Sequence, residues 1–155
     1  MTSNDILRRI RYTFDFNNRK MLEIFALAGY EVKPSQIIAW LQKDGDPDLV
    51  ELSDNELAYF LNGFINEKRG KKEGQQPVPE TTLNNNIIFR KLKIALNLKD
   101  TDILEILKLA DMRMSPHELS AFFRSPDQKQ YRICHDQFLR NFLHGLQLKY
   151  RENKK

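Results

Sequence analysis

The sequence predicts an all-α protein of two tandem, pseudo-symmetric four-helix repeats that share an interface, with about eight helices and no sheet. Two observations predict this fold. First, residues 4–69 align without a gap with residues 86–151, at a displacement of 82 positions. Second, apolar residues recur at helical spacing in both copies, and no stretch alternates with the period of two that indicates a strand.

The repeat is recognised from residues that are identical at equivalent positions. They include Asn4/Asn86, Ile6/Ile88, Arg8/Arg90, Leu22/Leu104, Glu23/Glu105, Ile24/Ile106, Leu27/Leu109, Ala28/Ala110, Pro34/Pro116, Ala39/Ala121, Asp54/Asp136, Phe60/Phe142, Leu61/Leu143, Gly63/Gly145 and Arg69/Arg151. Because a half of about 70 residues is marginal as an independent domain, we expect the two halves to share a core.

The repeat also sets the expected organisation of the chain. We predict helical repeat 1 at 1–69, an exposed linker at 70–85, helical repeat 2 at 86–151 and a frayed tail at 152–155. The linker is rich in Gly, Pro, Gln and charged residues, a composition typical of exposed connections.

The first two helices of each copy follow from caps and apolar spacing. We expect the first helix at about 5–15 and again at about 87–97. Asn4 and Asn86 stand just before them, where a side-chain oxygen can cap free amides, and we predict that role. The second helix, at about 18–28 and 100–110, is apolar almost all round and should be buried.

The third and fourth helices carry clearer start signals. The third begins at Pro34 and Pro116, because proline loses nothing at the first helical position. The fourth, at about 54–68 and 136–150, contains a glycine in both copies, Gly63 and Gly145. A glycine kept inside a helix despite its cost indicates a close helix crossing. We predict that the fourth helix forms part of the contact between the repeats.

A specific combination of segments runs through nearly the whole chain, namely 4–8, 24–29, 40–41, 60–63, 68–70, 131–132 and 136–145. In these segments the chain resembles the YehS-like family, small bacterial proteins that carry a domain of unknown function in two tandem copies. The resemblance implies a bacterial cytosolic protein, and it brings no catalytic residue, cofactor or substrate with it.

Three constellations could carry chemistry, and each has a simpler interpretation. Cys134-His135-Asp136 has the residue types of a nucleophilic site, but adjacent residues rarely meet in working geometry. Because Cys134 stands where the first copy has Leu52, we expect it to pack as a small apolar group. Residues 44–48 alternate carboxylates but lack the other ligands of a calcium loop, so we expect an acidic solvated loop.

Glu23 and Glu105 are acids kept in an otherwise apolar helix, and Arg8 and Arg90 are bases kept in its neighbour. We predict a partly buried Arg8–Glu23 ion pair and an equivalent Arg90–Glu105 pair, which orient the helices more than they stabilise them. A functional acid at these positions is the alternative.

Basic residues gather on the first helix of each copy, on the side away from its apolar stripe. They form a candidate anion or nucleic-acid surface consisting of Arg8, Arg9, Arg11, Arg90, Lys91 and Lys93. A solvated helix face is the simpler interpretation. If a pseudo-twofold axis brings both groups to one side, six cations could follow a phosphate backbone.

Composition and motifs favour a non-catalytic binding or adaptor protein. The net charge of +4 permits an anionic partner, and one cysteine allows no internal disulfide, which fits a reducing compartment. The expected location is the bacterial cytoplasm, without a membrane segment, metal or cofactor. We favour a protein partner, with a homo-oligomer possible. The alternatives are a nucleic-acid-binding protein that uses the paired basic helix faces, and an enzyme with a cleft between the repeats.

Overall fold

A computed structural model describes residues 1–152, in which eight α-helices are followed by a short π-helix and no strand occurs. The first repeat contains α1 (Ser3–Phe14), α2 (Asn18–Leu27), α3 (Pro34–Trp40) and α4 (Asp54–Arg69). The second contains α5 (Asn85–Ala95), α6 (Asp100–Leu109), α7 (Pro116–Ala121) and α8 (Asp136–Gln147), with η1 (Leu148–Glu152) after it. Glu152 therefore still belongs to a helix, and the rest of the predicted tail, 153–155, lies outside the described residues.

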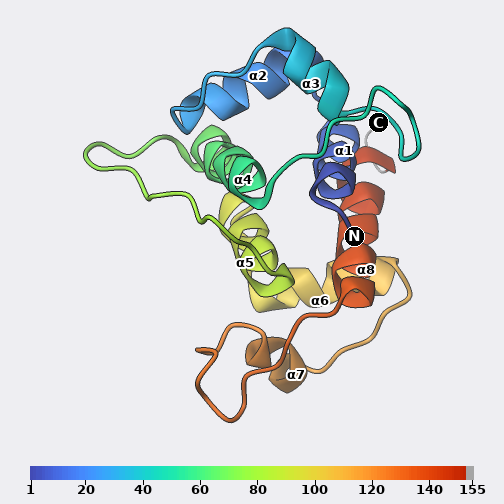
Figure 1. Ribbon diagram of the computed structural model, residues 1–155. Helices are drawn as coiled ribbons and strands as arrows, with labels where there is room; N and C mark the ends of the chain where they lie inside the picture. Colours follow the sequence, from blue (N-terminus) through green and yellow to red (C-terminus); the bar gives the residue numbers. More distant parts are fainter. Residues whose placement is uncertain (153–155) are drawn as a thin grey trace.

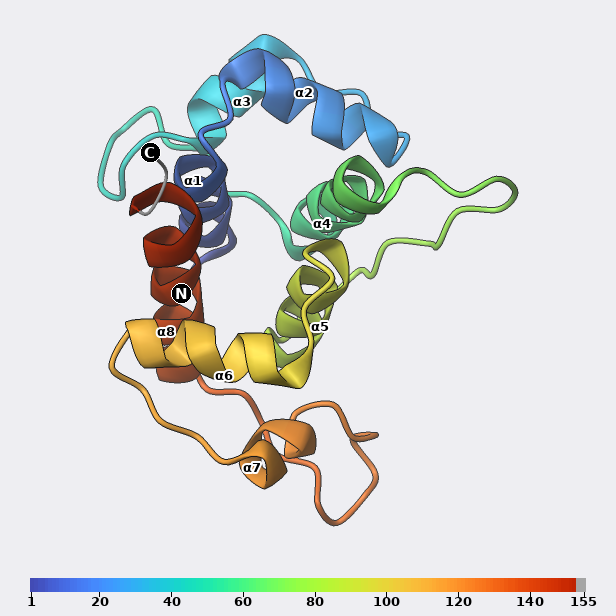
Figure 2. The ribbon, with the colours of Figure 1, turned by 180° about the vertical axis from the view of Figure 1, so that it is seen from behind.

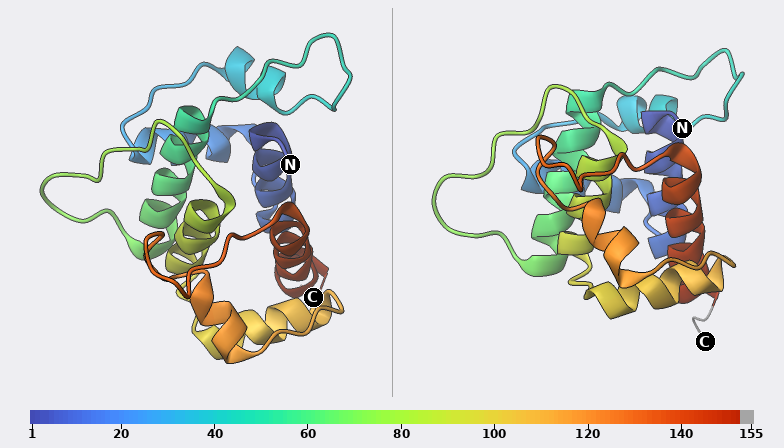
Figure 3. Two further views of the ribbon diagram at one scale, coloured as in Figure 1. Left: turned by 60° about the horizontal axis from the view of Figure 1, so that its bottom comes forward. Right: turned by 90° about the horizontal axis from the view of Figure 1, so that it is seen from below.

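The helices form a closed ring in which the two repeats contact each other at two places. Helix α4 packs against α5, and α8 packs against α1, so the fourth helix of each repeat lies on the first helix of the other (Figures 1 and 2). Seen from below, the α4–α5 pair and the α1–α8 pair face each other across the molecule (Figure 3). The predicted role of the fourth helix in the contact between repeats is confirmed.

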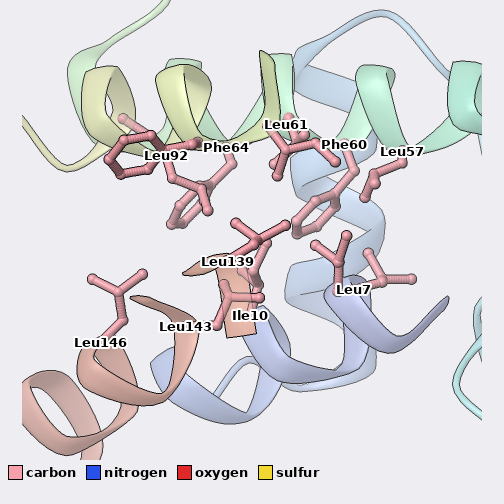
Figure 4. Close-up of a cluster of buried hydrophobic side chains, with 14 of the residues drawn as sticks. Leu7, Ile10, Leu57, Phe60, Leu61, Phe64, Leu92, Leu139, Leu143 and Leu146 are labelled. Atoms are coloured by element: carbon pink, nitrogen blue, oxygen red, sulfur yellow. The ribbon is translucent and has the colours of Figure 1, made fainter. Parts of the chain in front are cut away.

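The core lies where these four helices face one another. In Figure 4, Leu7 of α1, Phe60 of α4 and Leu139 of α8 point into one cluster. All three side chains are fully buried. The core is therefore continuous across both repeats, as expected for halves too small to stand alone.

The glycines kept in the fourth helices mark close crossings inside each repeat. A Cβ at Gly63 would lie 1.9 Å from the carbonyl oxygen of Ile24, and one at Gly145 would lie 2.3 Å from that of Ile106. These distances are far below van der Waals contact, so only glycine lets α4 approach α2 and α8 approach α6. The predicted close crossing is confirmed.

Asn4 and Asn86 are not helix caps, and that prediction is wrong. The caps are Thr2 and Asn84, whose side-chain oxygens accept hydrogen bonds from the amides of Asp5 and Ile87. Both candidate residues lie two positions after the cap, in the first turn of the helix, and are buried at 2% and 3% exposure. They serve long-range contacts instead.

Each of these asparagines fastens the first helix to the segment that precedes the fourth. The Nδ2 of Asn4 donates to the carbonyls of Trp40 (3.0 Å) and Val50 (2.9 Å), and its Oδ1 accepts from the amide of Leu52 at 2.9 Å. The equivalent partners of Asn86 are Phe122 O, Arg132 O and Cys134 N. Irregular backbone leaves polar groups without helical partners, and the buried amide satisfies three of them.

Local sequence signals account for other helix ends in the structure. Ser53 with Glu56, and Ser115 with Glu118, form reciprocal capping boxes at the starts of α4 and α7. Gly29 adopts the left-handed conformation that ends α2, at φ +79°. None of the described helices combines the length and apolar character that a membrane crossing requires.

Candidate anion-binding edge

The two contacts between the repeats form two equivalent edges of the ring. We call them the α4–α5 edge and the α8–α1 edge, each formed by the fourth helix of one repeat and the first helix of the other. The repeat places Arg69 and Arg90 at the α4–α5 edge, and Arg151 and Arg8 at the same positions of the α8–α1 edge. The two pairs therefore occupy equivalent positions of the repeat, although Arg69 ends the α-helix α4 and Arg151 lies in the π-helix η1.

At the α8–α1 edge, Arg151 is bound internally. One guanidinium nitrogen donates to the backbone carbonyl of Tyr12 at 2.6 Å and lies 3.3 Å from Oδ1 of Asp15. The guanidinium carbon also stands 3.9 Å from the centroid of the Tyr12 ring, in cation–π geometry. This arginine is occupied by its own protein.

Arg8 is occupied in the same way. One of its nitrogens donates to the carbonyl of Gln42 at 2.7 Å, and another lies 3.0 Å from Oδ1 of Asp44 and 3.7 Å from Oδ1 of Asp5. Three acids thus balance the two arginines at this edge, two at Arg8 and one at Arg151.

At the α4–α5 edge, Arg69 and Arg90 are exposed and form no ion pair or side-chain hydrogen bond with any described residue. The cause is visible in the aligned copies. The three acids of the other edge are replaced by uncharged residues: Asp5 by Ile87, Asp15 by Asn97 and Asp44 by Pro126. The arginines are retained here, but their internal partners are not.

A pocket adjoins these two arginines, and we call it the linker pocket. Its volume is about 550 Å³, and α4, α5 and the segment 70–84 form its walls. A shallower pocket of about 440 Å³ shares Arg69, Arg90 and Ile94 with it and continues toward Phe123. Because the chain joins the two repeats only once, the segment 70–84 covers this edge and has no equivalent at the other.

The inner wall of the linker pocket is polar and ordered. Lys91 Nζ donates to Oδ1 of Asn62 at 2.6 Å and lies 3.0 Å from Oε1 of Glu80. The backbone carbonyl of Glu80 accepts from Asn55 Nδ2 at 2.8 Å, which holds the linker against α4. Asn62 is only 9% exposed, and its Nδ2 has no partner among the described residues. A buried donor without a partner is rare and requires an explanation.

The six predicted surface cations fall into two separate groups. Helices α1 and α5 lie diagonally across the ring, not side by side (Figures 1 and 2). Arg9 lies 3.2 Å from Asp5, and Lys93 lies 3.4 Å from Asp100. Arg11 is partly buried, and its Nε has no partner within the part of the chain that the structure describes. Arg90 alone of the six is both exposed and free of such pairing.

The structure pairs the predicted ion-pair residues differently, which corrects that expectation. Arg8 turns toward Asp44, and Glu23 faces solvent with its side chain 54% exposed. The acid lies near the local bases Arg19 and Lys20, at 3.8 Å from each. In the second repeat, Glu105 lies 3.9 Å from Lys108, and Arg90 is unpaired as described above. Arg8 therefore finds its partner in the segment after α3, and Glu23 finds its partners within α2.

Cys134 is 1% exposed, as its interpretation as a small apolar group predicts. Burial raises the pKa of its thiol to about 12. The reactive thiolate is therefore absent near neutral pH. The carboxylates of residues 44–48 also have a structural use, since Asp44 holds Arg8.

The fold and this edge define a tandem-repeat helical protein with a cationic, amide-lined pocket between its repeats. The chain matches the family described as "Protein of unknown function (DUF1456)" over residues 3–70 and 85–152, and it belongs to that family. It is similar to "Uncharacterized protein YehS" of Escherichia coli (strain K12), with 47% identity over 147 residues that cover 94% of each chain. The resemblance seen in the sequence is confirmed. No solved structure matches the chain.

Proposed function

We propose that the chain is a non-catalytic binding protein of the bacterial cytoplasm, and that its binding site is the linker pocket with Arg69 and Arg90. One observation carries the proposal. The same arginine pair is neutralised by internal partners at the α8–α1 edge and has no such partner among residues 1–152 at the α4–α5 edge, beside the linker. If the fold required these charges, the arginines would have internal partners at both edges.

The pocket suits binding more than catalysis. Its lining includes arginine, lysine, glutamate, amide and isoleucine side chains, and none of its described residues is a cysteine, serine or histidine. Its volume lies within the range of about 300–1,000 Å³ that is typical of ligand sites. Guanidinium groups beside it would attract and orient an anionic ligand.

A binding experiment with defined probes tests the proposal. Inorganic phosphate, citrate, poly-glutamate and single-stranded RNA are titrated into the wild-type chain and into Arg69→Glu/Arg90→Glu. The control, Arg113→Glu/Arg140→Glu, reverses two exposed arginines elsewhere. At least one probe should bind the wild type and the control, and bind the first variant at least about tenfold more weakly. Equal behaviour of all three proteins with every probe would refute the proposal.

Nucleic-acid binding through Arg8, Arg9, Arg11, Arg90, Lys91 and Lys93 is the alternative function. Its support is the presence of a basic group on each first helix, although most of these side chains have internal partners. It requires that RNA affinity fall steeply with salt and that Arg8→Glu weaken it as strongly as Arg90→Glu. An effect confined to Arg90 would favour the linker pocket instead. A cleft enzyme is the second alternative, and it would require turnover of a bound ligand.

A further inference from the structure

Resting on the proposed function, we infer that the linker pocket binds a small sugar phosphate, with the phosphate monoester between Arg69 and Arg90 and the hydroxylated body against the linker. The inference names the chemistry of the ligand from four features of the site: its charge, its polar lining, its size and its unpartnered amide.

The charge of the edge matches a dianion, because the four cationic side chains that line the pocket outnumber its two carboxylates, Glu73 and Glu80. Arg69 and Arg90 provide two guanidinium groups without partners among the described residues, and both line the wall that the two pockets share. A phosphate monoester carries a charge of about −1.5 to −2 near neutral pH and has three strong acceptor oxygens. A carboxylate offers one charge and two oxygens. Two planar guanidinium groups therefore match a phosphate monoester better than a carboxylate.

The rest of the linker pocket matches hydroxyl groups. Asn62, Asn66, Gln75 and Gln76 line it with amides, which both donate and accept hydrogen bonds. The donors of Asn66 and Gln76 already serve the carbonyls of Leu27 and Lys72, so these two residues offer mainly their oxygens. Asn62 is the residue best suited to bind a ligand hydroxyl. Its Nδ2 is buried and has no hydrogen-bond acceptor in the described chain, while its Oδ1 accepts from Lys91. A ligand hydroxyl would supply the missing acceptor without disturbing that contact, after a small shift of a neighbouring side chain exposes this nitrogen, which is now buried.

The shape of the site separates a small molecule from a polymer. The linker pocket is bounded by segment 70–84 on one side and by α4 and α5 on the other, and about 550 Å³ holds a molecule of sugar size. The cations on α1 that could extend the path of a nucleic-acid backbone lie across the ring. Arg8 and Arg9 have internal partners, and Arg11 is partly buried. An acidic peptide would leave the buried amide wall unused.

The repeat supplies a variant that closes the site without removing either arginine. Asn97 stands at the position of Asp15, with φ 53° against 56°, so aspartate is known to fit this backbone. Asn97→Asp gives Arg69 the carboxylate partner that Arg151 has at the other edge. Gln137→Glu adds the same charge at an exposed position of α8 and serves as the control.

The test is calorimetric titration with glucose phosphate, ribose phosphate and glycerol phosphate. Glucose, gluconate, inorganic phosphate, poly-glutamate and single-stranded RNA are the comparison probes. At least one sugar phosphate should bind more tightly than glucose, gluconate and inorganic phosphate. Its affinity should fall by about tenfold or more in Asn97→Asp and stay unchanged in Gln137→Glu. Asn62→Ala should weaken the sugar phosphate more than inorganic phosphate.

The outcomes separate this inference from the proposed function. If no phosphate monoester binds, or if binding ignores Asn97→Asp, the inference is overturned. If poly-glutamate or RNA then binds in a manner that depends on Arg69 and Arg90, the binding function stands with a different ligand. If no probe depends on those arginines, both are overturned. Circular dichroism of each variant verifies that its helical fold is intact.

Discussion

The α4–α5 and α8–α1 edges have the same fold and the same arginines but treat those arginines in opposite ways. At the α8–α1 edge, Arg8 and Arg151 are held by acids and backbone carbonyls. At the α4–α5 edge, Arg69 and Arg90 face a pocket. The comparison shows that residues identical in both copies occupy equivalent positions but need not have the same role. Whether an arginine is paired or available depends on neighbouring residues that differ between the copies.

The largest expected effect breaks a feature on which both copies agree. Gly63→Ala should destabilise the fold by about 3 kcal/mol or more, because the new Cβ meets a backbone oxygen that cannot rotate away. Gly145→Ala should cost slightly less, since its clash is milder. Urea unfolding provides the measurement, and His144→Ala, at an exposed neighbouring position, is the control with an effect within about 0.5 kcal/mol. A fully stable Gly63→Ala variant would contradict the close crossing.

The buried asparagines provide the next test of equivalence. Asn4→Ala and Asn86→Ala should each cost about 2–4 kcal/mol, because three backbone groups lose their partner in each case. Chemical denaturation of the two variants should give similar losses. If one substitution proves nearly neutral, the two repeats are not held together internally in the same way.

Cys134 gives the second repeat a pH dependence that Leu52, at the equivalent position of the first, cannot give. Its pKa lies at about 12 in the folded chain against an ordinary value of 9.0, so the unfolded chain loses its proton first as pH rises. Stability from this group is thus complete below about pH 9 and declines above it, by about 1.4 kcal/mol at pH 10.

The measurement for Cys134 is urea unfolding across this pH range. Cys134→Val should lose this part of the pH dependence, because valine, like Leu52 at the equivalent position, does not titrate. Alkylation of the native wild type at pH 8 should also be slow. Fast native alkylation would show that the thiol is not buried as described.

The smallest effect addresses the arginines themselves. Arg151→Ala should lower stability by about 1 kcal/mol, since it removes a hydrogen bond, a partly exposed ion pair and a cation–π contact. Arg69→Ala should change stability by less than about 0.5 kcal/mol. Thermal unfolding of both variants in parallel gives the comparison. Equal losses would mean that Arg69 also has an internal partner, which would remove the basis of the binding proposal.

Much of the fold could be predicted from the sequence, because a local pattern found in both copies of the repeat indicates the fold that they share. The helix order, the capping boxes at Ser53 and Ser115, and the crossing at Gly63 all follow from local spacing. The buried role of Asn4 could not be found in that way, since its partners lie 36–48 residues away. A polar residue identical in both copies and on the same stripe as Leu7 was the available signal.

The candidate site was only partly accessible from the sequence. Arg8 and Arg90 were recognised as retained cations, but the orientation of Glu23 depends on how α2 sits in the ring, which spacing does not define. The useful signal was in the partners. Loss of the acids equivalent to Asp15 and Asp44 in the second copy marks the edge where arginines become available. The pocket itself depends on the path of segment 70–84.

The exchange of first and fourth helices has a consequence for how such a chain can specialise. A single copy of the unit would find its missing neighbour only in another molecule, and such a dimer would carry two identical rims that mutate together. Joining two copies in one polypeptide removes that constraint. One rim can then keep its charges locked to preserve the ring, while the other releases them for use by something from outside.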